Sequence, residues 1–426
     1  MREMKDSGIE WIGQIPTGWE LRRAKTLFTQ RNSKGNEIEV LLSPTQKYGV
    51  VPQRQLEGVV QVKEDTDLQM FKTVHKGDFV ISLRSFQGGF EYSLYEGVCS
   101  PAYQVFYPTS PICDTYYRYL FKSQSFISKM NNLTVGIREG KNIQYVDFAN
   151  SQIPVPPLAE QERIAAFLDA ECAEIDAVLE KTRASIEEYK KLKQAVITQA
   201  VTKGIRGDRP MKNSGIEWIG EIPVEWEIRK IFRAINKVGD IDHYMPDSVD
   251  DGIPYLMTGD LQEKLSDVNL KHCKKVSFQD YEMLSSKIRV SKGDVIFARY
   301  ATIGTVCFVD TEDNILVSYA CLIIKPNSSL LYGEFLLYYL KSTAFLEEIK
   351  QYIKANTQAN VGLDSVSKAK IALPSVHEQQ KIVEYLRDKC KKIDALIRKK
   401  QQYLTEIENY KKSLIYEYVT GKKEVV

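Results

Sequence analysis

Net charge is almost absent from this chain of 426 residues, because 58 lysines and arginines oppose 56 aspartates and glutamates to give +2 at pH 7. A chain without a basic excess does not attract a polyanion through its overall field. Any nucleic-acid contact must therefore come from local basic clusters or from another subunit. Apolar runs of membrane length and an apolar N-terminal segment are also missing. These absences predict a cytoplasmic protein with no membrane partner.

Cysteine and histidine are few and scattered. The seven cysteines include no Cys-x-x-Cys pair, and the four histidines stand apart from one another. Zinc ligands usually occur in short-spaced pairs, and disulfide frameworks belong to small secreted domains. We therefore expect no metal site on this chain, no disulfide framework and a reducing environment.

Motifs for nucleotide binding and methyl transfer are missing too. No Gly-x-x-x-x-Gly-Lys-Ser/Thr segment occurs, so the sequence contains no P-loop for ATP. Pro156-Pro157 follows Val155 and does not form the Asn-Pro-Pro-Tyr type of loop that holds a base for methylation. No serine, cysteine or histidine has the neighbours of a catalytic triad. The sequence predicts that the chain is not an enzyme and has no catalytic residues.

What the chain does contain is an internal repeat. Residues 4–20 return without a gap as 211–227, with both tryptophans kept, and residues 153–164 return as 371–382. A period near two hundred residues is too long for a solenoid or a propeller blade. The repeat therefore indicates two copies of a whole module.

Each half of the chain divides in the same way. About 150 residues of mixed character come first, with short β-rich runs after a Lys-Gly-Asp turn and helical stretches further on. Prolines then end the globular part, because proline disfavours helix at the residue before it. The predicted parts are two domains and two long helices, in the order 1–157, 158–204, 205–375 and 376–426.

Each proline break is followed by a long segment of strong helix formers. Its apolar residues recur at alternating spacings of four and three, which is the pattern of a heptad repeat. Polar residues interrupt the two patterns at equivalent places, Thr182 with Lys400 and Lys193 with Lys411, and such residues fix the register of a coiled coil. The predicted seam residues are Leu168, Ile175, Leu179, Ile186, Leu386, Ile393, Ile397 and Leu404.

The simplest partner for each long helix is the other helix of the same chain. Two helices that follow two equivalent domains pack antiparallel if a pseudo-two-fold axis relates the halves. The sequence therefore predicts an α+β fold, in which two similar mixed α/β domains are each followed by a long helix. The two helices pair as an antiparallel coiled coil, and a helix of about 45 residues is roughly 65–70 Å long.

Together these segments resemble one family, the DNA-specificity subunits of Type I restriction-modification systems. The resemblance covers nearly the whole chain. It lies in the Ser-Gly-x-Glu-Trp-x-Gly-x-Ile-Pro-x-x-Trp opening at 7–19 and 214–226, in the Lys-Gly-Asp strand, and in the Ile-Pro-x-Pro-x-x-x-Glu-Gln-x-x-Ile start of each helix. The second half departs from the last pattern at Ala372, where proline is missing, but it keeps Glu378 and Gln379.

The resemblance implies two target-recognition domains that each read one half of a bipartite double-stranded DNA site. It implies helices that set the unread spacer and dock two methyltransferase subunits. Adenine-N6 methylation with S-adenosylmethionine and cleavage with ATP and Mg would belong to other subunits, including the restriction and translocase subunits, in a prokaryotic phage-defence system. The alternative interpretation is a non-catalytic coiled-coil scaffold with two protein-binding heads.

Polar loops beside the predicted strands supply candidate DNA contacts. Arginine can donate to guanine O6 and N7, and glutamine can bond to adenine N6 and N7. The loop at 83–89 combines Arg84 and Gln87 with two glycines that allow close backbone approach. The predicted DNA-binding residues are Lys47, Tyr48, Arg54, Arg84, Ser85, Gln87, Arg138, Lys141, Asn142, Arg299, Tyr300, Thr302, Lys354, Asn356 and Gln358.

The halves differ most in their middles. Residues 29–75 and 236–291 share almost nothing, whereas the ends and helices match. Two modules with one scaffold and different middles suit two readers of different half-sites, which predicts an asymmetric site. Ordinary drift after duplication is the alternative explanation.

Overall fold

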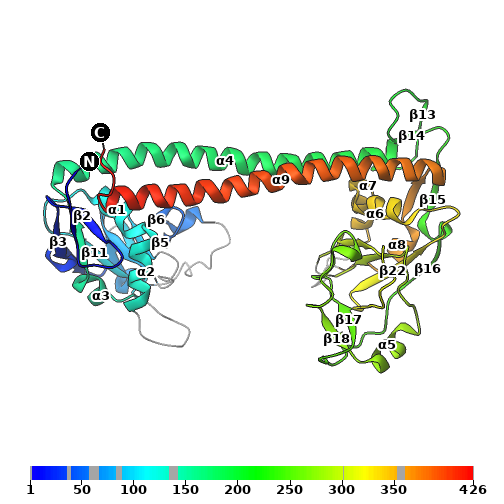
Figure 1. The fold of residues 1–426 in the computed structure, drawn as a ribbon, viewed down its shortest axis with the longest axis horizontal. Helices are drawn as coiled ribbons and strands as arrows, with labels where there is room; N and C mark the ends of the chain where they lie inside the picture. The colour runs from blue at the N-terminus through cyan, green and yellow to red at the C-terminus, as the bar shows by residue number, and fades with distance from the viewer. Residues whose placement is uncertain are drawn as a thin grey trace. The chain divides into compact units, whose positions relative to one another are not determined.

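The computed structural model describes residues 2–35, 40–56, 67–82, 89–133, 143–300, 302–352 and 360–425. These residues form two compact units, which can be followed in Figure 1 by the colour of the chain. Unit 1 comprises residues 1–183 and 402–426, and unit 2 comprises residues 184–401. Each unit therefore combines one globular domain with parts of both long helices.

Unit 1 is built on a four-stranded antiparallel sheet with the order β4-β11-β8-β9. In the same order, the strands are β4 (Phe28–Arg31), β11 (Gln104–Pro108), β8 (Phe79–Ile81) and β9 (Phe90–Tyr92). Among the described residues of the domain, three short α-helices follow the sheet: α1 (Asp114–Lys122), α2 (Gln124–Leu133) and α3 (Tyr145–Asn150). The Lys-Gly-Asp segment forms the predicted turn before β8, where Gly77 has a φ of 95°.

Two further antiparallel pairs hold the ends of the first domain. The strand β1 (Met4–Asp6) pairs with β2 (Gln14–Pro16). The strand β3 (Glu20–Arg23) pairs with β12 (Gln152–Val155), which leads into the first long helix. This second pairing brings the two repeated segments of the first half side by side.

Unit 2 repeats this frame. Its four-stranded antiparallel sheet has the order β16-β22-β19-β20, formed by β16 (Ile235–Gly239), β22 (Cys321–Pro326), β19 (Val295–Ala298) and β20 (Val306–Phe308). The equivalents of the paired strands are β13 (Met211–Asn213) with β14 (Glu221–Pro223), and β15 (Glu227–Lys230) with β23 (Lys370–Leu373). The equivalent helices are α6 (Gly333–Lys341), α7 (Thr343–Lys350) and α8 (Leu363–Lys368).

The middle segments fold differently in the two units. Unit 1 has two two-stranded pairs, β5 (Leu42–Thr45) with β6 (Gly49–Pro52) and β7 (Lys72–Val74) with β10 (Gly97–Cys99). Unit 2 instead has a three-stranded sheet of β18 (Lys274–Val276), β17 (Ile253–Leu256) and β21 (Leu316–Val317), together with the helix α5 (Phe278–Ser285). The difference expected from the sequence is thus a difference in local topology.

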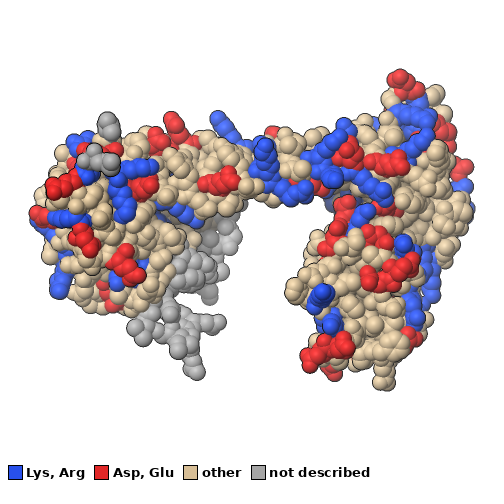
Figure 2. All heavy atoms as spheres, in the orientation of Figure 1, with Lys and Arg blue, Asp and Glu red and all other residues tan. Residues whose placement is uncertain are grey.

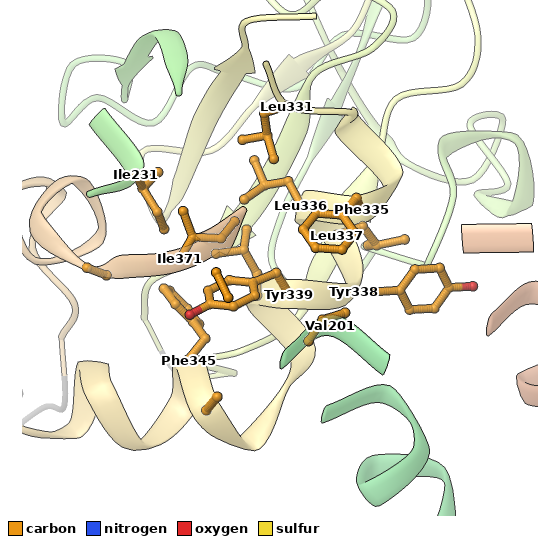
Figure 3. Packing of buried hydrophobic residues seen from close by; sticks show 14 of the residues in the cluster. Val201, Ile231, Leu331, Phe335, Leu336, Leu337, Tyr338, Tyr339, Phe345 and Ile371 are labelled. Atoms are coloured by element: carbon orange, nitrogen blue, oxygen red, sulfur yellow. The ribbon is translucent and has the colours of Figure 1, made fainter. Parts of the chain in front are cut away.

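The cores of the two units differ in composition. In unit 1 the ring of Phe28 makes edge-on contacts with Phe79, Phe106 and Tyr117 at centroid distances of 5.3–5.8 Å. In unit 2 most core residues are aliphatic. The helix α6 contributes many of them, and every residue of α6 from Gly333 to Leu340 is buried. Figure 3 shows residues of α6 in one cluster with Ile371 of β23 and with Val201, which lies near the end of the first long helix. The long helix is therefore part of the core of unit 2.

The two long helices are α4 (Leu158–Lys203) and α9 (Val376–Val419). Both run without internal proline or glycine, and both end at a glycine with positive φ, Gly204 at 77° and Gly421 at 71°. Such a left-handed residue is the usual stop for an α-helix. Among the described residues, no helix is both long enough and apolar enough to cross a lipid bilayer.

The predicted antiparallel pairing of the helices is confirmed within each unit. In unit 1 the first part of α4 packs with the last part of α9, where Phe167 lies 4.5 Å from the ring of Tyr418. In unit 2 the first part of α9 packs with the last part of α4. Of the predicted seam residues, Ile397 and Leu404 are partly buried, and the following are buried: Leu168, Ile175, Leu179, Ile186, Leu386 and Ile393.

Polar residues of the seam make matching ion pairs in both units. Lys411 binds Asp176 at 2.7 Å in unit 1, and Lys193 binds Asp394 at 2.7 Å in unit 2. The lysines occupy equivalent positions in the repeat, and so do the aspartates. A shift of one heptad would place Lys193 opposite Arg387 or Gln401 instead of Asp394, so this pair favours one antiparallel register.

Candidate nucleic-acid interface

The turn between β5 and β6 presents a cation beside an aromatic ring. Lys47 and Tyr48 are exposed, and the lysine Nζ lies 4.8 Å from the centre of the tyrosine ring. The Thr45 hydroxyl accepts a hydrogen bond from the Tyr48 amide at 3.1 Å and donates one to the Gly49 carbonyl at 2.9 Å. These bonds stabilise the turn, so two side chains suited to phosphate and base contacts are displayed on an ordered tip.

The other candidates of unit 1 divide into two groups. Arg54 is exposed in a short 3₁₀ turn that follows β6. The remaining candidates lie outside the described residues, namely Arg84, Ser85, Gln87, Arg138, Lys141 and Asn142. Their role in DNA contact stays a prediction.

In unit 2, candidate residues meet where β19 ends. Arg299 Nη1 binds Asp240 at 3.0 Å, and its guanidinium lies 5.0 Å from the ring of Tyr300. Asn360 donates to the Tyr300 hydroxyl at 3.1 Å, and the Val361 amide donates to the Arg299 carbonyl at 3.1 Å. The result is a supported arginine–tyrosine pair at the edge of the sheet.

Thr302 is exposed two residues after this pair. Lys354, Asn356 and Gln358 lie outside the described residues, in the segment that directly precedes Asn360 in the chain. Their role also stays a prediction. The sequence does not predict a role for Asp240, because a single aspartate in a segment without a repeat counterpart carries no signal of pairing; in the structure it is partly buried. Among the described residues, no His, Cys, Asp and Glu side chains cluster in a way that could hold a metal ion.

The repeated tryptophans belong to helix junctions rather than to the candidate interface. In unit 1 the buried Trp19 donates from Nε1 to Glu160 Oε2 at 2.9 Å, and Arg2 binds Glu160 Oε1 at 2.7 Å. The guanidinium of Arg2 also lies 5.4 Å from the indole ring. We call Arg2, Trp19 and Glu160 the unit 1 junction, because Glu160 opens α4 and the other two belong to the globular domain.

The unit 2 junction consists of Arg209, Trp226 and Glu378. Trp226 donates to Glu378 at 3.0 Å, Arg209 binds the same carboxylate at 2.6 Å, and the arginine lies 5.0 Å from the indole ring. A partly buried carboxylate is stabilised when both of its oxygens accept hydrogen bonds, as they do in both units. In the sequence, the junctions are indicated by the two repeated segments, which lie at the two ends of each domain.

The glutamine beside each junction glutamate ties the helix start to the domain. Gln161 accepts from the Cys113 amide at 2.9 Å and donates to the Pro156 carbonyl at 2.8 Å. Gln379 accepts from the Tyr332 amide at 2.7 Å and donates to the Pro374 carbonyl at 2.9 Å. The Glu-Gln pair of the repeat therefore has a structural explanation in both halves.

The glycine that ends each long helix lies against the junction of its unit. A Cβ on Gly421 would lie 2.5 Å from Pro16 Cδ and 2.9 Å from the indole of Trp19. A Cβ on Gly204 would lie 1.9 Å from the Arg209 guanidinium and 3.2 Å from the indole of Trp226. Each domain is therefore fastened to the start of one long helix and to the end of the other.

The helix pair carries opposite charge in the two units. In unit 1, residues 158–183 hold seven acidic and three basic side chains, and residues 402–419 hold three acidic and two basic ones. In unit 2, residues 184–203 hold two acidic and four basic side chains, and residues 376–401 hold four acidic and eight basic ones. Basic side chains gather along this second segment in Figure 2. The near-zero net charge of the chain thus conceals a local basic cluster of the kind that phosphate contacts require.

A buried carboxylate lies beneath the β5–β6 turn. Glu91 of β9 is 1% exposed and binds Lys122 of α1 at 2.5 Å, and Lys122 Nζ also lies 3.5 Å from the Gln46 carbonyl in the turn. Burial raises the pKa of Glu91 to about 7, although the lysine opposes the shift. The folded chain therefore keeps a proton that the unfolded chain releases near its ordinary pKa of 4.5.

We expect this proton to make unit 1 less stable as the pH rises from about 4.5 to about 7. The folded state binds more protons than the unfolded state in that window, so the free energy of unfolding falls by roughly 1–3 kcal/mol across it. Glu91→Gln should remove this slope, whereas Glu162→Gln, at an exposed position of α4, should keep it. Denaturant unfolding at several pH values measures both variants. An unchanged slope in Glu91→Gln would contradict the assignment.

The fold and its junctions define a two-module protein whose modules share a frame, differ in their middles and are fastened to two paired helices. The sequence pattern of the family described as "Type I restriction modification DNA specificity domain" matches residues 16–188 and 223–408. The two matches cover most of the chain, and the protein belongs to this family.

Individual relatives agree with this assignment. The chain is 23% identical over 304 residues to the Type I restriction enzyme EcoBI specificity subunit of Escherichia coli, which covers 70% of this chain and 63% of the relative. It is 27% identical over 301 residues to the MjaVIII specificity subunit of Methanocaldococcus jannaschii, covering 67% and 66%. It is 25% identical over 456 residues to the putative MjaX specificity subunit of the same organism, covering 97% and 96%. The chain thus spans less than two thirds of the length of the EcoBI and MjaVIII relatives.

A solved structure has the same fold. A chain from a study of complex assembly and conformational transition of the type I R-M system superposes with a TM-score of 0.69. The match covers 96% of this chain and 99% of the other, at 16% sequence identity. The likeness supports the fold described above.

Proposed function

We propose that this chain is the DNA-specificity subunit of a Type I restriction-modification complex. Each domain reads one half of an asymmetric bipartite site in double-stranded DNA, and the long helices set the unread spacer and dock two methyltransferase subunits. The chain itself is non-catalytic. S-adenosylmethionine, ATP and Mg act on partner subunits, which include the restriction and translocase subunits.

The observation that carries this proposal is one frame with two different middles. The four-stranded sheet, the flanking helices and the helix junctions recur in both units, whereas the segments after β4 and β16 fold into different sheets. A scaffold that presents two different surfaces suits the recognition of two different sequences. Drift alone would not be expected to spare the junctions while replacing whole strands.

Each unit also displays side chains suited to DNA. Unit 1 presents the exposed Lys47 and Tyr48 on a turn, and unit 2 holds the partly buried Arg299, bound to Asp240, and Tyr300 at the end of β19. Lysine serves phosphate contacts, and the planar guanidinium of arginine can bond to guanine O6 and N7 together. Because the two displays differ in chemistry and in position within the frame, the two half-sites should differ as well.

The test is the methylation pattern of DNA from cells that express the chain with its methyltransferase subunit. We expect one bipartite, asymmetric motif, and no methyl transfer by the purified chain alone. Arg299→Ala should relax only the half-site read by unit 2, because a good bidentate base contact discriminates by about 1–3 kcal/mol. Arg289→Ala removes an exposed arginine of the same unit, which binds Glu282, and should leave the motif unchanged.

Three outcomes would contradict the proposal. Methyl transfer by the isolated chain would place catalysis on it, and a continuous motif would remove the need for two readers. A change in both half-sites on Arg299→Ala would assign this arginine a structural role.

The second candidate, a scaffold with two protein-binding heads, predicts a different response to salt. Binding through phosphates weakens steeply as salt rises, because each neutralised phosphate releases counterions. Contacts between apolar protein surfaces lack that dependence. A titration of duplex DNA against the complex at several salt concentrations separates the two functions.

A further inference from the structure

The two copies of the opening repeat, residues 4–20 and 211–227, are more similar in sequence than the contacts within each unit require. Thirteen of the seventeen residues in 4–20 are identical to those in 211–227. The four that differ between the copies are at positions 6, 14, 17 and 18, and all four side chains are exposed in the first copy. Exposed positions in this segment have therefore been free to change, and an exposed position that has not changed needs a reason.

Most of the identical residues have a reason inside their own unit. The isoleucines at 12 and 15 and Trp19 are buried, as are their counterparts at 219, 222 and 226. Ser7 and Ser214 bond to the amides of Ile9 and Ile216, and the lysines at 5 and 212 donate to backbone carbonyls. Glu20 and Glu227 each bind an arginine two residues further along. These contacts account for folding and for the junctions.

Glu10 and Glu217 are the exception. Both are exposed, and neither makes a hydrogen bond or an ion pair with any of the described residues. The tryptophan that follows each of them, Trp11 or Trp218, is only partly buried. The ring of Trp11 packs edge-on against Phe126 of α2 at 5.6 Å, so its position is fixed while part of it remains exposed. Each unit thus presents an unpaired carboxylate beside an indole.

A cavity adjoins the Glu-Trp pair in both units. In unit 1 the cavity has a volume of 600 Å³ and is lined by the loop from Gly8 to Trp11, by Arg23 and Lys129, and by the end of α3. In unit 2 a cavity of 490 Å³ is lined by Glu217, Trp218 and the α7 residues Glu347 and Lys350. The same two elements, the loop after the first strand of the hairpin and the second helix of the domain, form the cavity in both.

The chemistry of these walls favours a protein partner. An exposed carboxylate repels phosphate, and the cavities carry side chains of both signs rather than a basic excess. A carboxylate next to a partly exposed indole suits a lysine or arginine side chain, whose charge meets the carboxylate and whose body contacts the ring. Tryptophan is also enriched among residues that dominate binding energy at protein interfaces.

We propose that the Glu10–Trp11 and Glu217–Trp218 surfaces are two equivalent docking sites, each binding one methyltransferase subunit through a basic side chain. This inference rests on the proposed function and adds, beside the contacts of the long helices, one required contact on each globular domain. Equal surfaces bind equal partners, so the duplication of the surface accounts for two copies of one subunit on a single chain. The middle segments, which differ between the two units, remain free to contact DNA.

The test titrates the purified methyltransferase subunit against the chain and measures stoichiometry by native mass spectrometry and sedimentation. The wild-type chain should bind two copies, Glu10→Arg and Glu217→Arg one copy each, and the double variant none at concentrations that saturate the wild type. Affinity at a reversed site should fall at least tenfold. Because both glutamates are exposed and unpaired, the thermal unfolding of all variants should match that of the wild type.

Matched controls reverse a charge nearby. Glu3→Arg in unit 1 and Glu221→Arg in unit 2 change exposed glutamates of the same segments, at positions where the other copy has proline or glutamine. Both controls should still bind two copies. Two copies on the double variant, or one copy on the wild type, would overturn the docking sites while leaving the specificity function intact. A wild-type chain that binds no methyltransferase subunit would overturn both.

Discussion

Replacing Trp226 with alanine should lower the free energy of unfolding of unit 2 by about 3–5 kcal/mol. The side chain is fully buried, and its removal leaves a cavity against Gly204 and deprives Glu378 of a hydrogen-bond donor. For a unit of this size, such a loss corresponds to a fall of about 10 °C in the melting temperature. Calorimetry together with hydrogen exchange of α6 would measure it.

The control for this variant is Phe232→Ala. Phe232 is an aromatic residue of the same unit that is 46% exposed, so its removal should change stability by less than about 1 kcal/mol. Trp19→Ala should reproduce the large effect in unit 1 and leave exchange in unit 2 unchanged, since Trp19 belongs to the unit 1 junction. Equal losses for Trp226→Ala and Phe232→Ala would show that the junction does not stabilise the unit.

The second large effect concerns the spacer. Repeating residues 177–183 after position 183 in α4, and residues 395–401 after position 401 in α9, adds one heptad to each helix at equivalent points. The insertions lie at the boundaries of the two units, so the contacts within each unit are kept. One heptad adds about 10 Å of helix, and one base pair of DNA rises about 3.4 Å. The gap between half-sites should lengthen by up to about three base pairs.

Sequencing of methylated DNA from cells that express this variant with its methyltransferase subunit measures the gap. Both half-site sequences should persist, because neither domain is altered. The same insertion in α4 alone is the control, since it displaces one helix against the other and separates either Lys193 from Asp394 or Lys411 from Asp176. That variant should lose stability and methylation together. An unchanged gap in the double insertion would mean that the helices do not set the spacer.

Much of the fold could be predicted because its strongest features are local and repeated. Each long helix is predicted by forty or more residues of helix-forming composition between a proline and a glycine. The spacing of its apolar residues indicates that it packs against a partner helix. The duplication implies that the partner is the other helix, and antiparallel packing follows. Leu168 and Leu386, two of the predicted seam residues, are buried.

Other features depend on contacts between distant residues, which no local pattern encodes. Glu160 is 141 residues from Trp19, and nothing in either neighbourhood reveals that they form a hydrogen bond. The strands of the middle segments have only two to four residues, too few for a periodicity to be recognised. Among the candidate DNA contacts, Arg299 is indicated by its place directly after a strand. Its ion pair with Asp240 could not be predicted, because it depends on β16 and β19 belonging to the same sheet.

The sharing of helix ends also has a consequence for biosynthesis. Domains of a nascent chain commonly fold in order from the N-terminus as they leave the ribosome. Here unit 2 has all of its residues once position 401 has emerged, whereas unit 1 still lacks the Val419 carbonyl, to which Tyr116 donates a hydrogen bond at 2.7 Å. The first domain to be translated is therefore the last to be completed, and until then its core lacks the buried residues Leu414 and Val419.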